Sequence, residues 1–334
     1  MPLQGEFEWI ARIRAMFAPL AAGRGRTGIG DDAAVLPQGG GRSLVVTTDM
    51  LVEGRHFLHE KITPEELGRK SLAVNLSDIA AMGARPIASF LSVALSSLAD
   101  DAFFGGFMQG YAEMSERYGV PLLGGDTTAS STGVVVNVAL LGEADDTHIK
   151  YRSTARPGDA VIVTGPLGDS AAGLKLLLSG DTAENLTAEE ITLVKTHHNP
   201  RPHVEEGLFL GAERDVHAMM DVSDGVASDL RHILRASGVA AEVFMDKTPL
   251  SSRLQELCTR RGWDARELAF AGGEDYVLLA TVAPEALDDI QKRYAEKFNE
   301  KLFVIGRIAS GSPRIAWTEQ GVPRPLDYHG FTHF

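Results

Sequence analysis

Aspartates occupy positions in this chain where the surrounding pattern is apolar. Asp49 interrupts the hydrophobic segment 43–54 (SLVVTTDMLVEG), and Asp78 lies on a helical stripe of apolar or small residues with spacings of 4, 3, 4 and 3. Asp126 follows two glycines, and so does the pair Glu274-Asp275. Taken singly, such carboxylates are often helix caps, turn residues or satisfied buried acids. Taken together, they predict a fold that gathers carboxylates at one end of a sheet.

Apolar strand patterns alternate with helical patterns along the whole chain. A capping box, Thr63-Pro64-Glu65-Glu66, predicts a helix that runs to about Met82. The other expected helices cover 7–18, ended by Pro19, and 100–118, with further helices after 165 and from 224 to Gly238. The expected strands cover 33–36, 43–54, 120–123, 134–142, 160–165, 217–223, 277–282 and 302–308. This order predicts an α+β or α/β fold.

A polar segment at 143–158 divides the pattern into two halves. The chain has 334 residues, and domains average about 150 residues, so two domains are expected. We place an N-terminal domain at 1–147 and a C-terminal α/β domain at 148–334.

Composition excludes several classes of protein. With 44% hydrophobic and 23% charged residues the chain is neither disordered nor fibrous. No apolar run reaches the roughly 18 residues of a membrane span, and the acidic N-terminus has no export signal, so a cytoplasmic location is expected. The single cysteine, Cys258, excludes an internal disulfide and a Cys-rich metal cluster. A net charge of −13 argues against nucleic acid or an anionic membrane as the main partner.

A cluster of carboxylates needs cations. Two carboxylates about 4 Å apart repel by roughly 4 kcal/mol at an effective dielectric near 20. Hard oxygen donors without cysteine favour Mg²⁺ over zinc or copper, and protein-bound Mg²⁺ commonly completes its shell with water and phosphate oxygens. Further candidates follow glycine turns or strand ends, namely Asp31, Asp32, Asp221 and Asp224. The expected substrate is a polyphosphate held through several metal ions.

Other motifs are less specific. Gly23-x-Gly25-x-x-Gly28 matches a dinucleotide fingerprint, but it follows a helical pattern and opens no helix. The segment 165–170 (GPLGDS) offers backbone N–H groups at a helix start. The histidines of 196–203 (THHNPRPH) are broken by prolines, which disfavours a metal site, whereas His56 is expected to face the carboxylates. The aromatic end DYHGFTHF is either a strand-end plug or a stacking surface.

The chain resembles one known family over nearly its whole length. The motifs, in chain order, are GIGDDAAV (28–35), TTDMLVEGRHF (47–57), NLSDIAAMGARP (75–86), GGDTT (124–128), RSTARPGD (152–159), VTGPLGDSAAGL (163–174), MDVSDGVASDL (220–230), AGGEDY (271–276) and a closing GFTHF. These resemble thiamine-monophosphate kinases, within the superfamily of aminoimidazole ribonucleotide synthetase. The segment EGRHF and the closing GFTHF favour this member over selenophosphate synthetase, whose reactive Cys or Sec lies near its N-terminus.

The resemblance implies transfer of the γ-phosphoryl group of ATP to thiamine monophosphate, assisted by several Mg²⁺ ions. It also implies a two-domain aminoimidazole ribonucleotide synthetase-like fold and a homodimer whose N-terminal sheets pair into a barrel. Because the acceptor is already an anionic phosphate, no protein general base is expected.

Site residues follow from the same resemblance. The implied metal ligands are Asp31, Thr47, Thr48, Asp49, Asp78, Asp126, Asp221 and Asp224. The implied ATP contacts are Gly125, Asp126, Arg152 and Ser223, and the implied thiamine phosphate contacts are His56, Glu274 and Phe331. Many family members have tryptophan where this chain has Phe331, and some have tyrosine where it has Met108.

Two alternatives remain at this point. One is a superfamily sibling that uses ATP to activate an amide or another oxygen. The other is a protein that binds Mg²⁺ and nucleotide without catalysis. An assay with ATP, Mg²⁺ and thiamine monophosphate separates the three hypotheses.

Overall fold

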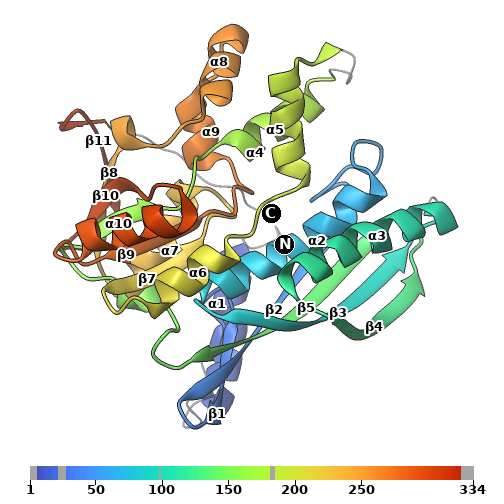
Figure 1. The fold of residues 1–334 in the computed structure, drawn as a ribbon, viewed down its shortest axis with the longest axis horizontal. Helices are drawn as coiled ribbons and strands as arrows, with labels where there is room; N and C mark the ends of the chain where they lie inside the picture. The colour runs from blue at the N-terminus through green and yellow to red at the C-terminus, as the bar shows by residue number, and fades with distance from the viewer. Residues whose placement is uncertain (1–5, 22–27, 98, 181–184, 325–334) are drawn as a thin grey trace.

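The computed structural model contains two β-sheets flanked by helices, and it describes residues 6–21, 28–97, 99–180 and 185–324 (Figure 1). The helices are α1 (Glu6–Ala21), α2 (Pro64–Ala81), α3 (Asp101–Tyr118), α4 (Asp169–Leu178), α5 (Ala188–His198), α6 (Val204–Ala212), α7 (Val226–Ser237), α8 (Ser252–Arg261), α9 (Ala265–Ala271) and α10 (Leu287–Phe298), with 3-10 turns η1 (Arg152–Thr154) and η3 (Met245–Lys247). This mixed architecture confirms the expected fold class.

The first sheet has five strands in the order β1-β2-β5-β3-β4, and only β3 and β4 run parallel. Its strands are β1 (Ala34–Gly39), β2 (Arg42–Val52), β3 (Arg85–Leu95), β4 (Leu122–Ala129) and β5 (Val135–Asp145). Helices α2 and α3 lie along one face of this sheet (Figure 1). All eight residues of the edge strand β4 are exposed.

The second sheet has seven strands in the order β12-β11-β8-β10-β6-β9-β7, and only β11 and β8 run parallel. Its strands are β6 (Ala160–Val163), β7 (Val216–Asp221), β8 (Ala240–Phe244), β9 (Leu278–Val282), β10 (Phe303–Ala309), β11 (Ile315–Glu319) and β12 (Val322–Pro323). No described helix combines the length and the hydropathy that a membrane span requires.

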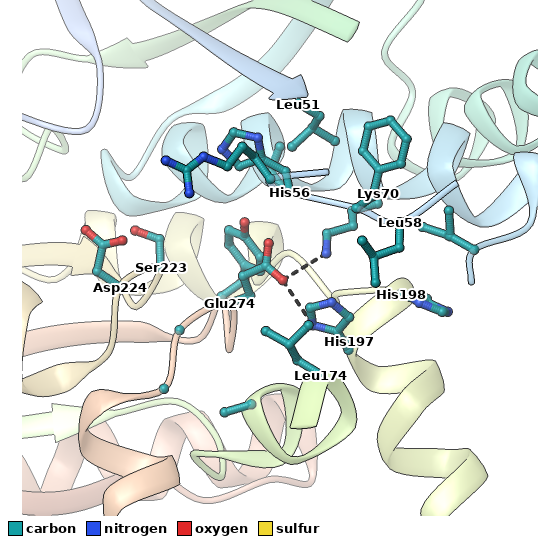
Figure 2. A pocket seen from close by; sticks show the side chains of 18 of the residues that line it. Leu51, His56, Leu58, Lys70, Leu174, His197, His198, Ser223, Asp224 and Glu274 are labelled. Carbon is teal, nitrogen blue, oxygen red and sulfur yellow. Dashed lines mark hydrogen bonds and ion pairs between the residues drawn. The ribbon is translucent and has the colours of Figure 1, made fainter. Parts of the chain in front are cut away.

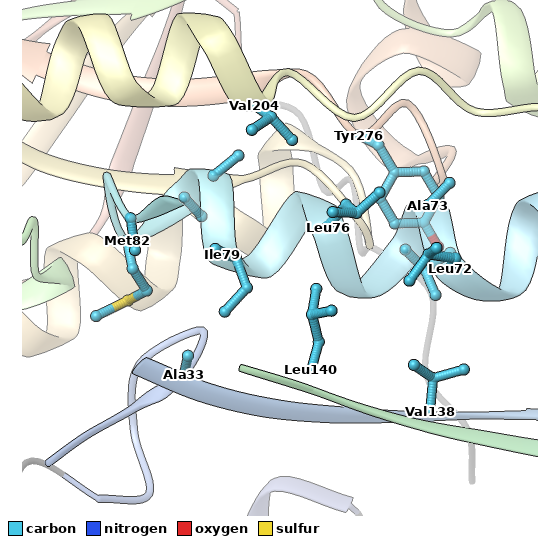
Figure 3. Close-up of a cluster of buried hydrophobic side chains, with 14 of the residues drawn as sticks. Ala33, Leu72, Ala73, Leu76, Ile79, Met82, Val138, Leu140, Val204 and Tyr276 are labelled. Carbon is cyan, nitrogen blue, oxygen red and sulfur yellow. The ribbon is translucent and has the colours of Figure 1, made fainter. Parts of the chain in front are cut away.

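Helix α2 joins the two halves of the molecule. It begins at the predicted capping box, where Thr63 and Glu66 bond each other's backbone N–H groups, and it ends at Met82 as expected. Thirteen of its residues are buried, because it packs on the first sheet on one side and on α6 and β7 on the other. Figure 3 shows Leu76 and Ile79 on α2 between Leu140 of the sheet and Val204 of the second half. One continuous core therefore spans both halves.

Glycines allow α2 and α3 to cross closely. A Cβ added at Gly68 would lie 2.0 Å from the carbonyl oxygen of Phe107, and one added at Gly110 would lie 1.9 Å from that of Glu65. Both distances are far below van der Waals contact, so these positions of the crossing require glycine.

Two expectations about secondary structure were wrong, and β3 is one of several elements that were not expected. Helix α1 continues through Pro19 to Ala21, so the proline does not end it. Strand β3 was missed although it lies inside the first sheet. Strand β4 includes Gly124-Gly125-Asp126, which we expected to form a turn after a shorter strand. In β4 the pairing with β3 outweighs the low strand propensity of glycine.

Candidate active site

Three aspartates far apart in the sequence meet beside α2. Carboxylate oxygens of Asp32, Asp78 and Asp221 lie within 4.8 Å of one another, and we call these three residues the carboxylate cluster. Asp32 precedes β1, Asp78 comes from the apolar stripe of α2, and Asp221 ends β7. The predicted convergence of carboxylates is confirmed for these positions.

The electrostatics of the cluster favour a bound cation. Loss of solvent, followed by repulsion from Asp49 and Asp221, raises the pKa of Asp78 well above its ordinary value. Burial and repulsion from Asp32 raise the pKa of Asp221 to about 8. Because a divalent cation removes this repulsion, the all-oxygen donor set fits Mg²⁺.

Hydroxyl and amide groups hold the cluster in place. Thr47 Oγ1 donates to a carboxylate oxygen of Asp78, and Ser77 Oγ donates to Asp221 Oδ2 at 2.6 Å. The backbone N–H of Asp49 donates to Asn75 Oδ1 at 3.1 Å, which fixes β2 against α2. Since successive side chains of a strand alternate, Thr47 and Asp49 both face α2 and the cluster.

Arg152 joins Asp31 and Asp32 to the second half of the chain. Arg152 Nη2 lies 2.7 Å from Asp32 Oδ1 and its Nε lies 3.2 Å from Asp32 Oδ2, while its backbone N–H donates to Asp31 Oδ1 at 2.8 Å. Burial, which outweighs the hydrogen bond from Arg152, raises the pKa of Asp31 to about 6. Asp31 therefore lies next to the cluster and is bound to the backbone of η1.

A cavity of about 680 Å³ opens beside the cluster. Its acidic lining includes Asp49, Asp78, Asp221 and Asp224, and its apolar lining includes Leu51, Phe57, Leu58, Ile62 and Leu174. Figure 2 shows Ser223 and Asp224 on one side, Lys70 and His197 on the other, and Glu274 between them. The cavity therefore combines carboxylates for metal ions with an apolar wall for a ring-bearing ligand.

Glu274 is held in an unusual backbone conformation. Its φ of 62° lies in the left-handed region, as does that of Tyr276 at 51°. The backbone N–H of Glu274 donates to the carbonyl oxygen of Ser223 at 2.7 Å, which connects this loop to the end of β7. Strained residues of this kind persist where the surrounding structure fixes them, and they are common at functional sites.

Comparisons with known proteins agree with this geometry. Two family models match, "AIR synthase related protein, N-terminal domain" over residues 30–144 and "AIR synthase related protein, C-terminal domain" over 156–317. The chain is 36% identical over 309 residues to the thiamine-monophosphate kinase of Bacillus subtilis (strain 168), which covers 92% of this chain and 93% of that protein. The chain belongs to the thiamine-monophosphate kinase family.

Solved structures show the same family fold. The structure of AaThiL complexed with AMPPCP and TMP has a TM-score of 0.84 and 32% identity, covering 99% of this chain and 97% of that chain. Thiamine-monophosphate kinase from Stenotrophomonas maltophilia K279a has a TM-score of 0.77 and 38% identity, covering 96% of this chain and 98% of that chain.

Two of the residues that the family resemblance assigned to metal lie away from the cluster. Thr48 and Asp126 belong to the opposite face of the first sheet from Thr47 and Asp49, because neighbouring residues of β2 alternate and Asp126 is paired with the exposed Ser92. Asp126 is also separated from Asp49 by three strand spacings, about 14 Å. Thr48, Gly125 and Asp126 therefore lie away from the carboxylate cluster of their own chain.

The substrate and nucleotide candidates are divided between the cavity and other places. His56, Ser223 and Glu274 line the cavity, as does the metal candidate Asp224, and Arg152 contacts Asp32 instead. Phe331 lies outside the described residues. Met108 is partly buried and packs against the hydrophobic core.

Two weaker motifs have structural partners in this family member. His197, His198 and His203 are buried beside different partners, respectively Glu274 at 3.0 Å, Glu66 at 3.4 Å and Thr164 at 3.1 Å, and they form no shared metal site. At the start of α4 the backbone N–H of Gly168 donates to both carboxylate oxygens of Asp275, at 3.0 and 2.9 Å. The N–H group of Gly168, which we expected to bind an external anion, therefore already binds the side chain of Asp275.

Sequence reasoning gave three residues of the site no role in it. Asp32 was a candidate carboxylate but was not among the metal ligands that the resemblance implied, yet it belongs to the carboxylate cluster. Lys70 and His197 bind Glu274 and line the cavity; Lys70 was not noticed, and His197 was considered only as part of a disfavoured metal site. A buried lysine on an apolar helix stripe is a usable signal, because it requires a nearby acid.

Proposed function

We propose that this family member transfers the γ-phosphoryl group of ATP to thiamine monophosphate, which gives thiamine diphosphate and ADP. The proposal depends mainly on one cavity. Its lining combines carboxylates suited to metal ions, the side chain of Glu274 and an apolar wall. The activity named for the relatives and the AMPPCP and TMP named for AaThiL support it.

The carboxylates form the metal-binding part of the proposal. Asp78 and Asp221, with Asp31, Asp49 and Asp224 around them, would hold several Mg²⁺ ions. Mg²⁺ bound there would neutralise charge on the phosphate groups. The raised pKa values of Asp31, Asp78 and Asp221 support this assignment, because burial raises each pKa by more than nearby hydrogen bonds and positive charge lower it.

Acceptor activation needs no protein base. An oxygen of the thiamine monophosphate phosphate attacks the γ-phosphorus, the bond from that phosphorus to the bridging oxygen breaks, and ADP leaves. The attacking oxygen is already ionised at neutral pH, so the chain has to align the two phosphates and no proton has to be removed. His56, Glu274 and Phe331 are the proposed contacts to the acceptor, and Gly125, Asp126, Arg152 and Ser223 are the proposed contacts to ATP.

A homodimer is part of the proposal. The face of the first sheet that carries Thr48 and Asp126 also exposes Met50 and Phe90, and the edge strand β4 exposes Leu122 and Leu123. Pairing of this face with a second copy into a barrel would cover these side chains and enclose Thr48 and Asp126.

The domain boundary at 147/148, between β5 and β6, and a cytoplasmic location also remain proposals.

The test is a direct product assay. The purified chain is incubated with ATP, Mg²⁺ and thiamine monophosphate, and thiamine diphosphate and ADP are quantified by chromatography. Equal amounts of both products are expected, and EDTA should abolish them. ADP without thiamine diphosphate would favour a superfamily sibling with another acceptor, and calorimetric binding of Mg-ATP without any ADP would favour a non-catalytic nucleotide-binding protein.

A further inference from the structure

One oxygen of Glu274 is held by two neighbouring side chains. Lys70 Nζ donates to Glu274 Oε2 at 2.8 Å, and His197 Nδ1 lies 3.0 Å from the same oxygen. Among the described residues, no hydrogen bond reaches the other oxygen, Oε1. Figure 2 shows this arrangement, with both dashed lines ending at Glu274 in the middle of the cavity. The carboxylate is therefore anchored at one oxygen and available at the other.

The lysine is fully buried, which is uncommon for this residue type. Its side chain is 0% exposed, and Glu274 is its hydrogen-bond partner. An ammonium group loses hydration energy on burial, and a neighbouring acid offsets this cost. Buried Lys70 therefore holds the Glu274 carboxylate next to it.

His197 adds a second constraint from α5. Burial, and then the charges of Lys70 and His198, lower its pKa well below 6.5, so the ring is neutral at physiological pH. The Nδ1 atom of this neutral ring is the atom that faces Glu274 Oε2. The same Nδ1 lies 3.1 Å from Ser170 Oγ, which holds the ring in this orientation.

The spacing along α2 connects this arrangement to the carboxylate cluster. Lys70, Val74 and Asp78 all line the cavity, and they are four residues apart on one stripe of the helix. Eight residues of α helix span about 12 Å. An extended ligand with its phosphate near Asp78 therefore places its other end near Lys70 and Glu274.

We propose that Lys70 and His197 are positioning residues that turn Oε1 of Glu274 toward the acceptor, where it accepts a hydrogen bond from the amino group on the substrate's pyrimidine ring. This inference rests on the proposed function, since it concerns the acceptor of the same reaction. It assigns the phosphate to the Asp78 end of the α2 stripe and the aminopyrimidine to the Lys70 end.

The first test replaces Lys70 by an uncharged side chain of similar length, Lys70→Met. The KM for thiamine monophosphate should rise at least about tenfold, the range for a lost hydrogen bond to a charged group, while kcat and the KM for ATP change little. Lys292→Met, on the exposed face of α10, is the matched control. An unchanged KM for thiamine monophosphate, or an equal rise in both KM values, overturns the inference.

A double-mutant cycle separates positioning from a general structural effect. In a Glu274→Gln background, Lys70→Met should raise the KM for thiamine monophosphate by no more than about twofold, because the residue through which it acts is already changed. Additive effects of the two substitutions would show that Lys70 acts independently of Glu274 and would overturn the proposal.

His197 provides a test that does not depend on Lys70. Asn and Leu have similar shapes, but only the Asn side chain can donate a hydrogen bond near the position of Nδ1. His197→Leu should raise the KM for thiamine monophosphate, and His197→Asn should raise this KM by a smaller factor. Equal KM values for the two variants contradict a positioning role. This pair also keeps the proposal testable if Lys70→Met does not fold.

A substrate analogue identifies the contacted group. Thiamine monophosphate with hydrogen in place of the pyrimidine amino group should bind the unaltered chain weakly, and Lys70→Met should weaken it no further. If Lys70→Met weakened the binding of substrate and analogue equally, the contact would not involve the pyrimidine amino group. If the unaltered chain forms no thiamine diphosphate at all, the proposed function and this inference fall together, whereas normal turnover with an unaffected Lys70→Met variant overturns only the inference.

Discussion

The guanidinium group of Arg152 binds both carboxylate oxygens of Asp32, at 2.7 and 3.2 Å. Asp32 belongs to the turn before β1, and Arg152 to η1 in the second half of the chain. The Asp32 side chain is 1% exposed, and that of Arg152 is 17% exposed. This pair therefore fixes the first half of the chain to the second at the edge of the carboxylate cluster.

Removal of the arginine should destabilise the protein strongly. Arg152→Met leaves Asp32 buried beside other carboxylates, and loss of one partner from a buried ion pair costs about 3–5 kcal/mol. Urea denaturation without metal measures this change. The double variant Arg152→Met with Asp32→Asn should recover most of the stability, because no unpaired charge remains. Equal stability of the single and double variants would contradict a buried pair.

Removal of a cluster carboxylate should separate stability from activity. Asp78→Asn should raise the melting temperature of the metal-free protein, because repulsion from Asp49 and Asp221 raises the pKa of Asp78 and opposes its ionisation. Product formation should fall at least about a hundredfold, since a direct metal ligand is lost. Asp288→Asn, exposed on α10, is the control for both measurements. Near-normal turnover by Asp78→Asn at saturating Mg²⁺ would refute the metal assignment.

The stability of the metal-free protein should depend on pH in a specific direction. Burial raises the pKa of Asp221 to about 8 in the folded protein, from an ordinary value of 3.8. Between these pH values the folded protein binds more protons than the unfolded chain, so the free energy of unfolding decreases as pH rises. Burial lowers the pKa of His203 to about 3, which acts in the opposite direction below about pH 6.5.

The diagnostic window is therefore pH 6.5 to 7.5, because burial lowers the pKa of Lys150 to about 8 and this opposes the decrease at higher pH. Thermal melts in EDTA should show a falling melting temperature across this window, and saturating Mg²⁺ should remove the decrease. Asp221→Asn should flatten the profile without metal. A melting temperature in EDTA that rises with pH would contradict the raised pKa of this carboxyl group.

The helix crossing offers a matched pair of glycine substitutions. Gly110→Ala places a Cβ 1.9 Å from the carbonyl oxygen of Glu65, so it should destabilise the fold by about 1–3 kcal/mol or more. Gly105→Ala, on the same helix, meets nothing within 4 Å and should stabilise by up to about 1 kcal/mol through helix propensity. Urea denaturation of both variants gives the comparison. Equal effects would mean that α2 and α3 do not cross at Gly110.

Local patterns predicted the helix α2 well and the strand β4 poorly. The capping box at Thr63 and the 3–4 periodicity to Met82 are properties of neighbouring residues, so they are visible in the sequence. Strand β4 depends on its ladder with β3, which only folding brings beside it, and two glycines in that segment indicated a turn. The missed strand β3 shows the same limit, since its pairing with β5 depends on distant residues.

The candidate site divides in a similar way. Carboxylates at apolar and glycine-rich positions could be recognised from residue type and spacing, which are local properties, and the motifs were sufficient to recognise the family. The folded arrangement was needed to show that Asp32 belongs to the cluster, that Thr48 and Asp126 face away from it, and that Lys70 and His197 bind one oxygen of Glu274. The physical reason is that contacts between residues up to 204 positions apart depend on strand pairing and helix packing, which no local pattern specifies.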